Sequence, residues 1–219
     1  GGVINGPGDL IKYSAGTLDL FGADQINPGS LIVNDGTVNV NDGALGSAVK
    51  VLVNSTGTTT GVLNVLDSET IGSLAGTGAN GQVNISSGAT LTTGGDNSST
   101  TFAGKIAGDG ALTKAGTGAM TLTGINTYAG GTSITGGSIR GYAGTTPTNG
   151  SLQGDIDVAL GASVMFDQTL SPLGNTSGTY AGQLSGGGFV SFLGNGTGIL
   201  TLTGDNTGMS GAMNFLNNS

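Results

Sequence analysis

Residues 108–139 read GDGALTKAGTGAMTLTGINTYAGGTSITGGSI, and the pattern within them points to the fold of the whole chain. Apolar side chains alternate with small or polar ones around Leu112 and Leu122, at the period of two that a strand with one buried face requires. Glycines separate these short runs and supply the positive-φ positions that tight turns need. The stretch therefore predicts short, half-buried strands joined by glycine turns.

The same alternation recurs along the rest of the chain. Apolar-polar-apolar triplets stand at 18–20, 38–40, 63–65, 83–85, 156–158 and 200–202. Glycine-containing turn sequences stand at 34–36, 86–88, 136–137 and 160–162. Helix formers are scarce, because the chain has a single glutamate, Glu69, and only five basic residues. We expect almost no helix.

A longer pattern repeats three times, and its copies lie near 6–40, 104–139 and 182–215. Lys12 of the first copy aligns with Lys114 of the second at an offset of 102 residues. Phe192 takes that position in the third copy, at an offset of 78 that becomes 80 before Leu200. Repetition on this scale is typical of architectures that stack one supersecondary unit on the next.

Short strands at regular spacing fit an antiparallel sandwich or propeller, or a solenoid that coils each strand onto its predecessor. The repetition favours the solenoid. With turns of roughly 20 to 25 residues, we expect about nine or ten of them. Residues 1–219 are then a single elongated all-β domain, and 142–151 form a loop that leaves one corner.

Composition excludes several classes of function. The chain has neither cysteine nor histidine, which removes thiolate nucleophiles, disulfides, zinc fingers and imidazole bases. Five scattered basic residues stand against 13 acidic ones, so no basic stripe is available for nucleic acid. No apolar run approaches the length of a spanning helix, so we expect no direct membrane insertion in this segment. We also expect no cofactor.

The stretch 108–139 resembles the passenger-associated strand repeat of bacterial autotransporters, with Met120 in place of the usual leucine. The residues on the repeat's positions are Gly110, Leu112, Lys114, Gly116, Gly118, Leu122, Gly124, Asn126, Thr127, Tyr128, Gly130, Gly131 and Thr132. The resemblance implies a right-handed parallel β-helix exported to the bacterial cell surface, and a membrane barrel in a longer precursor. Since the chain opens at Gly1 without an initiator methionine, we expect a processed product or a fragment.

Few residues qualify as a catalytic or metal site. Asp155 and Asp157 are two residues apart, hence on one face of a strand, and a carboxylate pair suggests glycoside hydrolysis. The alternation explains them equally as solvated neighbours of Ile156, and we predict no catalytic residue. Isolated fragments such as 34–36 are turn sequences, so we predict no metal site.

The remaining motif residues are expected to be structural. Lys12 and Lys114 hold equivalent positions, where a lysine pairs with an aspartate or covers apolar surface with its stem. Tyr128 and Tyr180 belong to the repeat and are expected inside the coil. Three phenylalanines near the C-terminal end are candidates for a cap on the last turn or for contact with another molecule, namely Phe189, Phe192 and Phe215.

The sequence thus favours a non-enzymatic, extracellular structural or adhesive β-helix. Its expected partners are a surface receptor or matrix, or other copies of itself in end-to-end or lateral association. The first alternative is a filament subunit that polymerises head to tail through its end turns. The second, less favoured, is a carbohydrate-active β-helix that uses Asp155 and Asp157.

Overall fold

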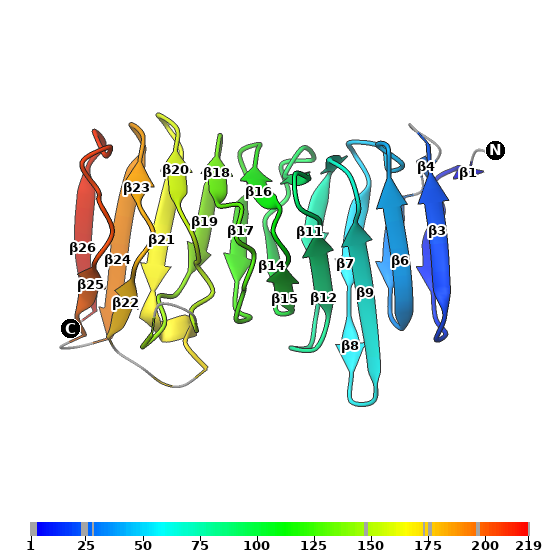
Figure 1. Ribbon diagram of the computed structural model, residues 1–219, viewed down its shortest axis with the longest axis horizontal. Coiled ribbons are helices and arrows are strands. Elements are labelled where there is room, and N and C mark those ends of the chain that lie inside the picture. Colours follow the sequence, from blue (N-terminus) through cyan, green and yellow to red (C-terminus); the bar gives the residue numbers. More distant parts are fainter. Residues whose placement is uncertain are drawn as a thin grey trace.

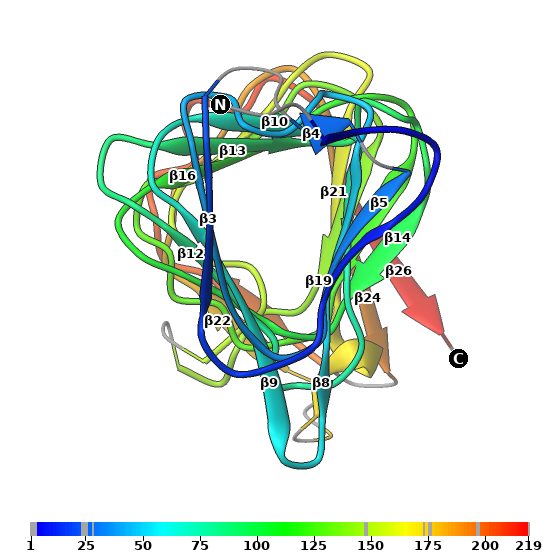
Figure 2. The ribbon, with the colours of Figure 1, turned by 90° about the vertical axis from the view of Figure 1, so that its right-hand side faces the viewer.

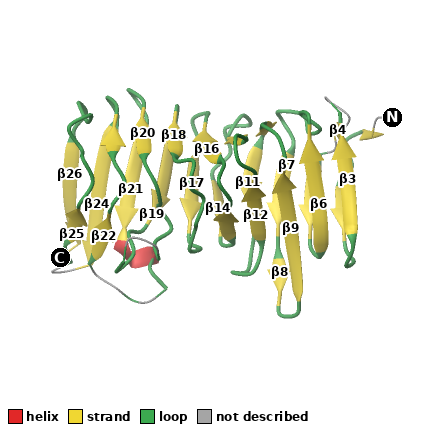
Figure 3. Ribbon diagram, in the orientation of Figure 1, coloured by secondary structure: helices red, strands yellow, loops and turns green. Residues whose placement is uncertain are grey.

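The computed structural model describes residues 4–22, 26–27, 29–146, 149–172, 174, 177–195 and 198–218. It is an all-β solenoid of about nine turns, built of stacked parallel sheets, as predicted. The two ends of the chain lie at opposite ends of the stack (Figure 1). Among the described residues, the single helical element is one 3₁₀ turn, Gln168–Leu170 (η1), drawn in red in Figure 3.

Each turn places strands on up to three faces, and the view along the stack shows a roughly three-sided outline (Figure 2). The first face consists of β2 (Leu10–Lys12), β5 (Ser30–Val33), β7 (Lys50–Val53), β11 (Ser73–Ala75), β14 (Thr100–Phe102), β17 (Ala119–Leu122), β19 (Ser138–Gly141), β21 (Ser163–Asp167), β24 (Phe189–Asn195) and β26 (Met213–Asn218). A parallel bridge between Gly76 and Phe102 links its two sheets.

The other two faces follow in chain order. The second face has β3 (Thr17–Phe21), β6 (Gly36–Asn41), β9 (Thr59–Val65), β12 (Gln82–Ile85) and β15 (Lys105–Ala107), then the pair β22 (Gly178–Tyr180) and β25 (Leu200–Leu202). The third face has β4 (Ile26–Asn27), which pairs with β1 (Ile4–Asn5), and the sheet β10 (Glu69–Ile71), β13 (Thr90–Thr93), β16 (Ala111–Lys114), β18 (Thr132–Ile134), β20 (Ile156–Val158) and β23 (Leu184–Ser185).

Among the described strands, only one pair is antiparallel. The short strand β8 (Ser55–Thr56) pairs with the start of β9, and this hairpin projects from the corner between the first and second faces (Figure 2). All other strand pairs are parallel, which is the arrangement that a coil of successive turns produces.

The core is a set of aligned apolar ladders inside the coil. On the second face, Val38 pairs with Leu63 and Leu63 with Val83, and all three side chains are completely buried. Burial alternates along these strands, so the predicted period of two is confirmed. Stacking in register lets each apolar side chain cover the one in the turn before, which removes both from water.

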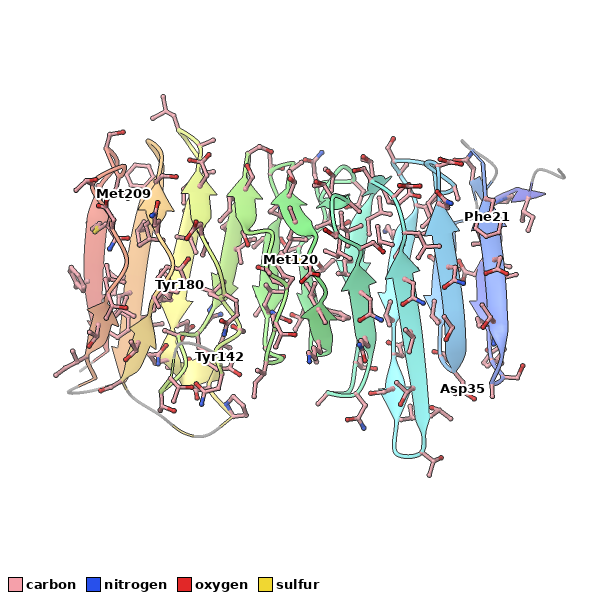
Figure 4. All side chains as sticks on the ribbon, in the orientation of Figure 1. Phe21, Asp35, Met120, Tyr142, Tyr180 and Met209 are labelled. Atoms are coloured by element: carbon pink, nitrogen blue, oxygen red, sulfur yellow. The ribbon has the colours of Figure 1, made fainter. Side chains whose placement is uncertain are left out.

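Turn lengths vary more than the roughly 20 to 25 residues predicted. Met120 pairs with Ile139, 19 residues later, whereas Ile156 pairs with Leu184, 28 residues later. The longer of these two turns carries η1. The loop at 142–151 is closed at its base, because the Ser151 backbone N–H donates to the Tyr142 carbonyl at 3.0 Å. Figure 4 labels Tyr142 near the lower margin of the stack.

Candidate functional site

The repeat lysine lies inside the coil and binds backbone carbonyls. Lys114 is almost fully buried, and its Nζ donates to the carbonyls of Ala115 at 2.5 Å, Gly116 at 3.3 Å and Gly136 at 3.5 Å. Burial lowers the pKa of Lys114, and the charge of Asp96 opposes that shift. The ammonium group of Lys114 therefore donates to backbone carbonyls of two successive turns. The expected aspartate is not among these acceptors.

Lys12, the aligned residue of the first copy, makes the same kind of contact near the N-terminal end. Its Nζ donates to the Ser14 carbonyl and to the Asp35 carbonyl, the latter at 3.3 Å. Each lysine thus binds carbonyls of the loop that follows its own strand, but the two loops lie at different corners. Lys12 ends β2 on the first face, whereas Lys114 ends β16 on the third face. Phe192, the aligned residue of the third copy, is buried in the core instead.

Asn126 replaces a strand on the second face. Between β17 and β18 the chain forms no strand, and the fully buried Asn126 side chain spans the gap. Its Oδ1 accepts from the Ile106 backbone N–H at 2.7 Å, and its Nδ2 donates to the Ser151 carbonyl at 2.7 Å. One side chain therefore links the turn before to the turn after.

The aligned residue of the third copy performs half of that task. Asn206 Oδ1 accepts from the Leu184 backbone N–H at 2.8 Å, while its Nδ2 bonds within its own turn to the Gly204 carbonyl at 2.9 Å. Repeat glycines allow the turns to approach each other at this corner. A Cβ at Gly124 would lie 2.0 Å from the carbonyl oxygen of Gly104.

The remaining repeat residues serve the stack in three ways. Leu112 and Leu122 are fully buried in the core. A Cβ at Gly110 or Gly118 would strike atoms of the preceding turn at 2.3 Å, and Gly131 has a positive φ of 79°. The Thr127 side chain is exposed, and its backbone N–H donates to the Ile106 carbonyl at 2.8 Å.

Both repeat tyrosines lie inside the coil. The Tyr128 hydroxyl is 2.6 Å from Thr132 Oγ1, and burial raises the pKa of Tyr128 to about 12. Tyr180, labelled in Figure 4, donates its hydroxyl hydrogen to the Gly154 carbonyl and packs edge-on against Phe166 at a centroid distance of 4.9 Å. Burial raises the pKa of Tyr180 as well.

An outward ladder of amides on the second face was not predicted. Asn39 Nδ2 donates to Asp19 Oδ1 at 2.6 Å, Asn64 Nδ2 to Asn39 Oδ1 at 2.8 Å, and Asn84 Nδ2 to Asn64 Oδ1 at 2.8 Å. Every bond therefore points toward the N-terminal end of the stack. The signal in the sequence is the asparagine at the centre of the apolar triplets 38–40, 63–65 and 83–85.

An ion pair on the first face was also missed. Arg140 on β19 pairs with Asp167 at the end of β21, whose side chain is fully buried. Asp167 also accepts from the backbone N–H of Thr169 at 2.9 Å and so caps η1. The partners are 27 residues apart, one long turn, and no local pattern connects them.

Asp155 and Asp157 both point outward on the third face. Asp155 Oδ1 accepts from the Gln183 backbone N–H at 2.8 Å, and Asp157 Oδ1 accepts from Ser185 Oγ at 2.8 Å. Both line an open hollow of about 250 Å³ together with hydroxyl side chains and small residues of β13, β16 and β18. The alternation therefore assigns the correct face to the pair, and the stacking supplies its surroundings.

Two of the three C-terminal phenylalanines lie next to each other in the fold, and the third lies apart. Phe192 is buried, and its ring lies 6.3 Å from that of Phe215 on the edge strand β26. Phe215 is 70 % exposed and lines a hollow of about 310 Å³ with Ile199 and Leu216. Phe189 is exposed and pairs in register with Ser163. The structure thus brings two of the three together.

Neither a metal cluster nor a membrane-spanning helix occurs in the described part of the chain. Across these residues there is no group of three or more acidic, histidine or cysteine side chains arranged to hold a metal ion. Within the same residues, no helix has the length and apolar character needed to cross a membrane.

Comparison with known proteins agrees with the repeat that the sequence shows. The family model described as passenger-associated-transport-repeat matches residues 112–140 and 195–215. The adhesin BmaC autotransporter of Brucella suis biovar 1 (strain 1330) is 37 % identical over 137 aligned residues, which cover 51 % of this chain and 4 % of that protein. The chain thus spans a small part of its relative's length. No solved structure matches it significantly.

Proposed function

We propose that the chain, which matches the autotransporter passenger repeat over residues 112–140 and 195–215, is a rigid, non-enzymatic segment of a cell-surface passenger that mediates adhesion. The observation that carries the proposal is the coincidence of the passenger repeat with a continuous solenoid. The matched residues 112–140 supply the lysine, asparagine and glycines that join successive turns. A longer passenger built in this way displays its outer faces at a fixed spacing from the cell.

The interior of the coil supports a structural rather than a catalytic role. The buried polar groups of the repeat, Lys114 and Asn126, are hydrogen-bonded to backbone groups of their own and neighbouring turns. Their hydrogen-bonding groups therefore hold successive turns of the coil together. On β12, β13 and β18 the outward positions carry polar side chains in a row along each strand, an arrangement that suits contact with an extended partner.

Adhesion is the role named for the Brucella relative, and its transfer to this chain is tested directly. Beads coated with the purified chain are compared with albumin-coated beads for attachment to cultured epithelial cells and to extracellular-matrix films. We expect the chain-coated beads to attach to the cells or to the matrix films. Soluble chain added to the assay should inhibit that attachment. Attachment equal to that of albumin beads on every surface would refute the proposal.

Surface location has an independent test. Antibodies raised against the chain are applied to intact and to permeabilised cells of a bacterium that produces the full-length protein. We expect equal labelling in both samples, because an exported passenger is accessible from outside. Labelling that requires permeabilisation contradicts the proposed role.

Self-association is a second candidate role, and one observation favours it. Within the described residues β26 is the last strand of its sheet, and it presents the exposed apolar side chains Met213, Phe215 and Leu216. A parallel strand of a second copy would cover them. Sedimentation velocity at increasing concentration tests this, with Phe215→Ser as the variant that removes the largest exposed ring. Concentration-independent monomers would exclude this role.

A further inference from the structure

The third face carries a hollow where the side chains of one outward row become small. Along this row, Thr90 pairs with Ala111, and the next positions are Gly131 and Asp155. Ala111 has only a methyl group and Gly131 has no side chain, so the surface is lower at these two positions than at Thr90 and Asp155. Ala111 and Gly131 form the floor of the hollow. At about 4.8 Å per turn, these two residues stand about 14 Å apart along the stack.

A second outward row, two residues further along each strand, forms the side of the hollow. It presents Thr113, Ser133, Asp157 and Ser185 in successive register positions. Hydroxyl groups both donate and accept hydrogen bonds, whereas ionised carboxylates only accept. The lining is therefore rich in acceptors and has two negative charges.

The ligand that enters this hollow meets side chains, because the backbone is already paired. The strands β16, β18 and β20 lie in the middle of a six-stranded sheet and have hydrogen-bonded neighbours on both sides. A peptide that adds a strand needs a free sheet edge, and this position offers none. The lining residues include no aromatic side chain and, apart from Leu112, no large aliphatic one. A polyhydroxyl molecule satisfies such a lining better than a peptide does.

Charge decides between neutral and acidic ligands. Asp155 and Asp157 each have one carboxylate oxygen engaged by a donor of the next turn, Gln183 N–H or Ser185 Oγ. The second oxygen of each is available to a hydroxyl donor of a ligand, in a charge-assisted hydrogen bond. No lysine or arginine lines the hollow, and the chain has a net charge of −8, so an anionic ligand is repelled.

We propose that this hollow binds a neutral glycan across the turns between Thr90 and Asp155, with Asp155 and Asp157 accepting hydrogen bonds from its hydroxyl groups. The inference rests on the proposed adhesive function and assigns a ligand class to it. Thr113 and Ser133 complete the contact from the side of the hollow, where they donate to or accept from ring and hydroxyl oxygens. No bond of the glycan is broken.

Isothermal titration calorimetry of the purified chain with neutral hexasaccharides tests the proposal. The probes are cellohexaose, maltohexaose and chitohexaose, with hexagalacturonate as the acidic comparison. We expect at least one neutral probe to bind at millimolar concentration and hexagalacturonate not to bind. Failure of all three neutral probes, or equal binding of the acidic one, would overturn the inference.

Two variants locate the binding. Ala111→Trp fills the floor, and we expect affinity to fall by about tenfold or more. The matched control is Ala119→Trp, an outward alanine of β17 on the first face, which should bind as the wild type does. Asp155→Asn with Asp157→Asn keeps the oxygens that accept from the next turn but removes both charges, and we expect weaker binding again. Unchanged affinity in either hollow variant would refute the location.

A glycan site is distinguished both from a cation site and from the adhesive function itself. If Ca²⁺ alone binds the wild type and not the double asparagine variant, the hollow is a cation site and the glycan proposal is wrong. If coated beads attach to cells but no neutral glycan binds, the glycan inference fails while the adhesive function stands. If the beads do not attach and a neutral probe binds, only the adhesive function fails.

Discussion

Replacing Asn126 by alanine tests whether one buried amide joins three turns of the coil. The substitution removes the acceptor of the Ile106 N–H and the donor to the Ser151 carbonyl, both 2.7 Å from the amide. Because Asn126 is completely buried, water does not replace these contacts without opening the coil. Each buried polar group left without a partner costs about 1–3 kcal/mol. We therefore expect the free energy of unfolding to fall by about 4 kcal/mol.

The measurement is urea denaturation followed by far-ultraviolet circular dichroism, together with hydrogen exchange at the Ile106 amide. That amide should lose most of its protection in the variant. Thr127→Ala is the matched control, since the neighbouring side chain is exposed, and its effect should stay within about 0.5 kcal/mol. A loss below about 1 kcal/mol for Asn126→Ala, or an equal loss for the control, would refute the role assigned to the amide.

Three other expectations follow from the buried groups. Because burial lowers the pKa of Lys114 from its ordinary value of 10.5, the unfolded chain binds more protons than the folded chain just below pH 10.5. The stability of the wild type, relative to that of Lys114→Met, should therefore rise with pH in that window. A difference in urea midpoints that falls with pH would contradict this expectation. Gly124→Ala should cost about 3 kcal/mol or more, because its Cβ meets a carbonyl oxygen at 2.0 Å, whereas Gly8→Ala, with open space around it, should change the urea midpoint little. In an alkaline absorbance titration of the folded chain, Tyr128 and Tyr180 should stay neutral at pH 10, where an exposed tyrosine is half ionised. Tyrosinate absorbance from either residue near pH 10 would show that its ring is not buried.

The hollow around Asp155 and Asp157 could be predicted only in part from the sequence. The period-two pattern correctly predicted that Asp155 and Asp157 point outward, one directly before β20 and the other on it. It gave no neighbours, because Thr90 and Ala111 reach the same surface from turns far earlier in the chain. The same pattern also allows a catalytic pair of aspartates, but the side chains that surround the pair are set only by the stacking of distant turns.

Local sequence was sufficient to predict the strands, the turns and the coil. Alternating triplets such as 38–40 and glycines such as Gly36, whose φ is 73°, are local signals, because a strand's buried face and a tight turn each involve only a few consecutive residues. The repeat in 108–139 then predicted that successive units stack, and the parallel sheets confirm it.

Which side chains meet between turns depends instead on the three-dimensional stack. Asn126 binds groups 20 residues before it and 25 residues after it, and Arg140 reaches Asp167 across 27. These separations differ because loops lengthen some turns and not others, from 19 to 28 residues between paired positions. Which residues meet in a solenoid depends on how many residues each turn contains. That number is fixed only when the apolar ladders of successive turns align in register.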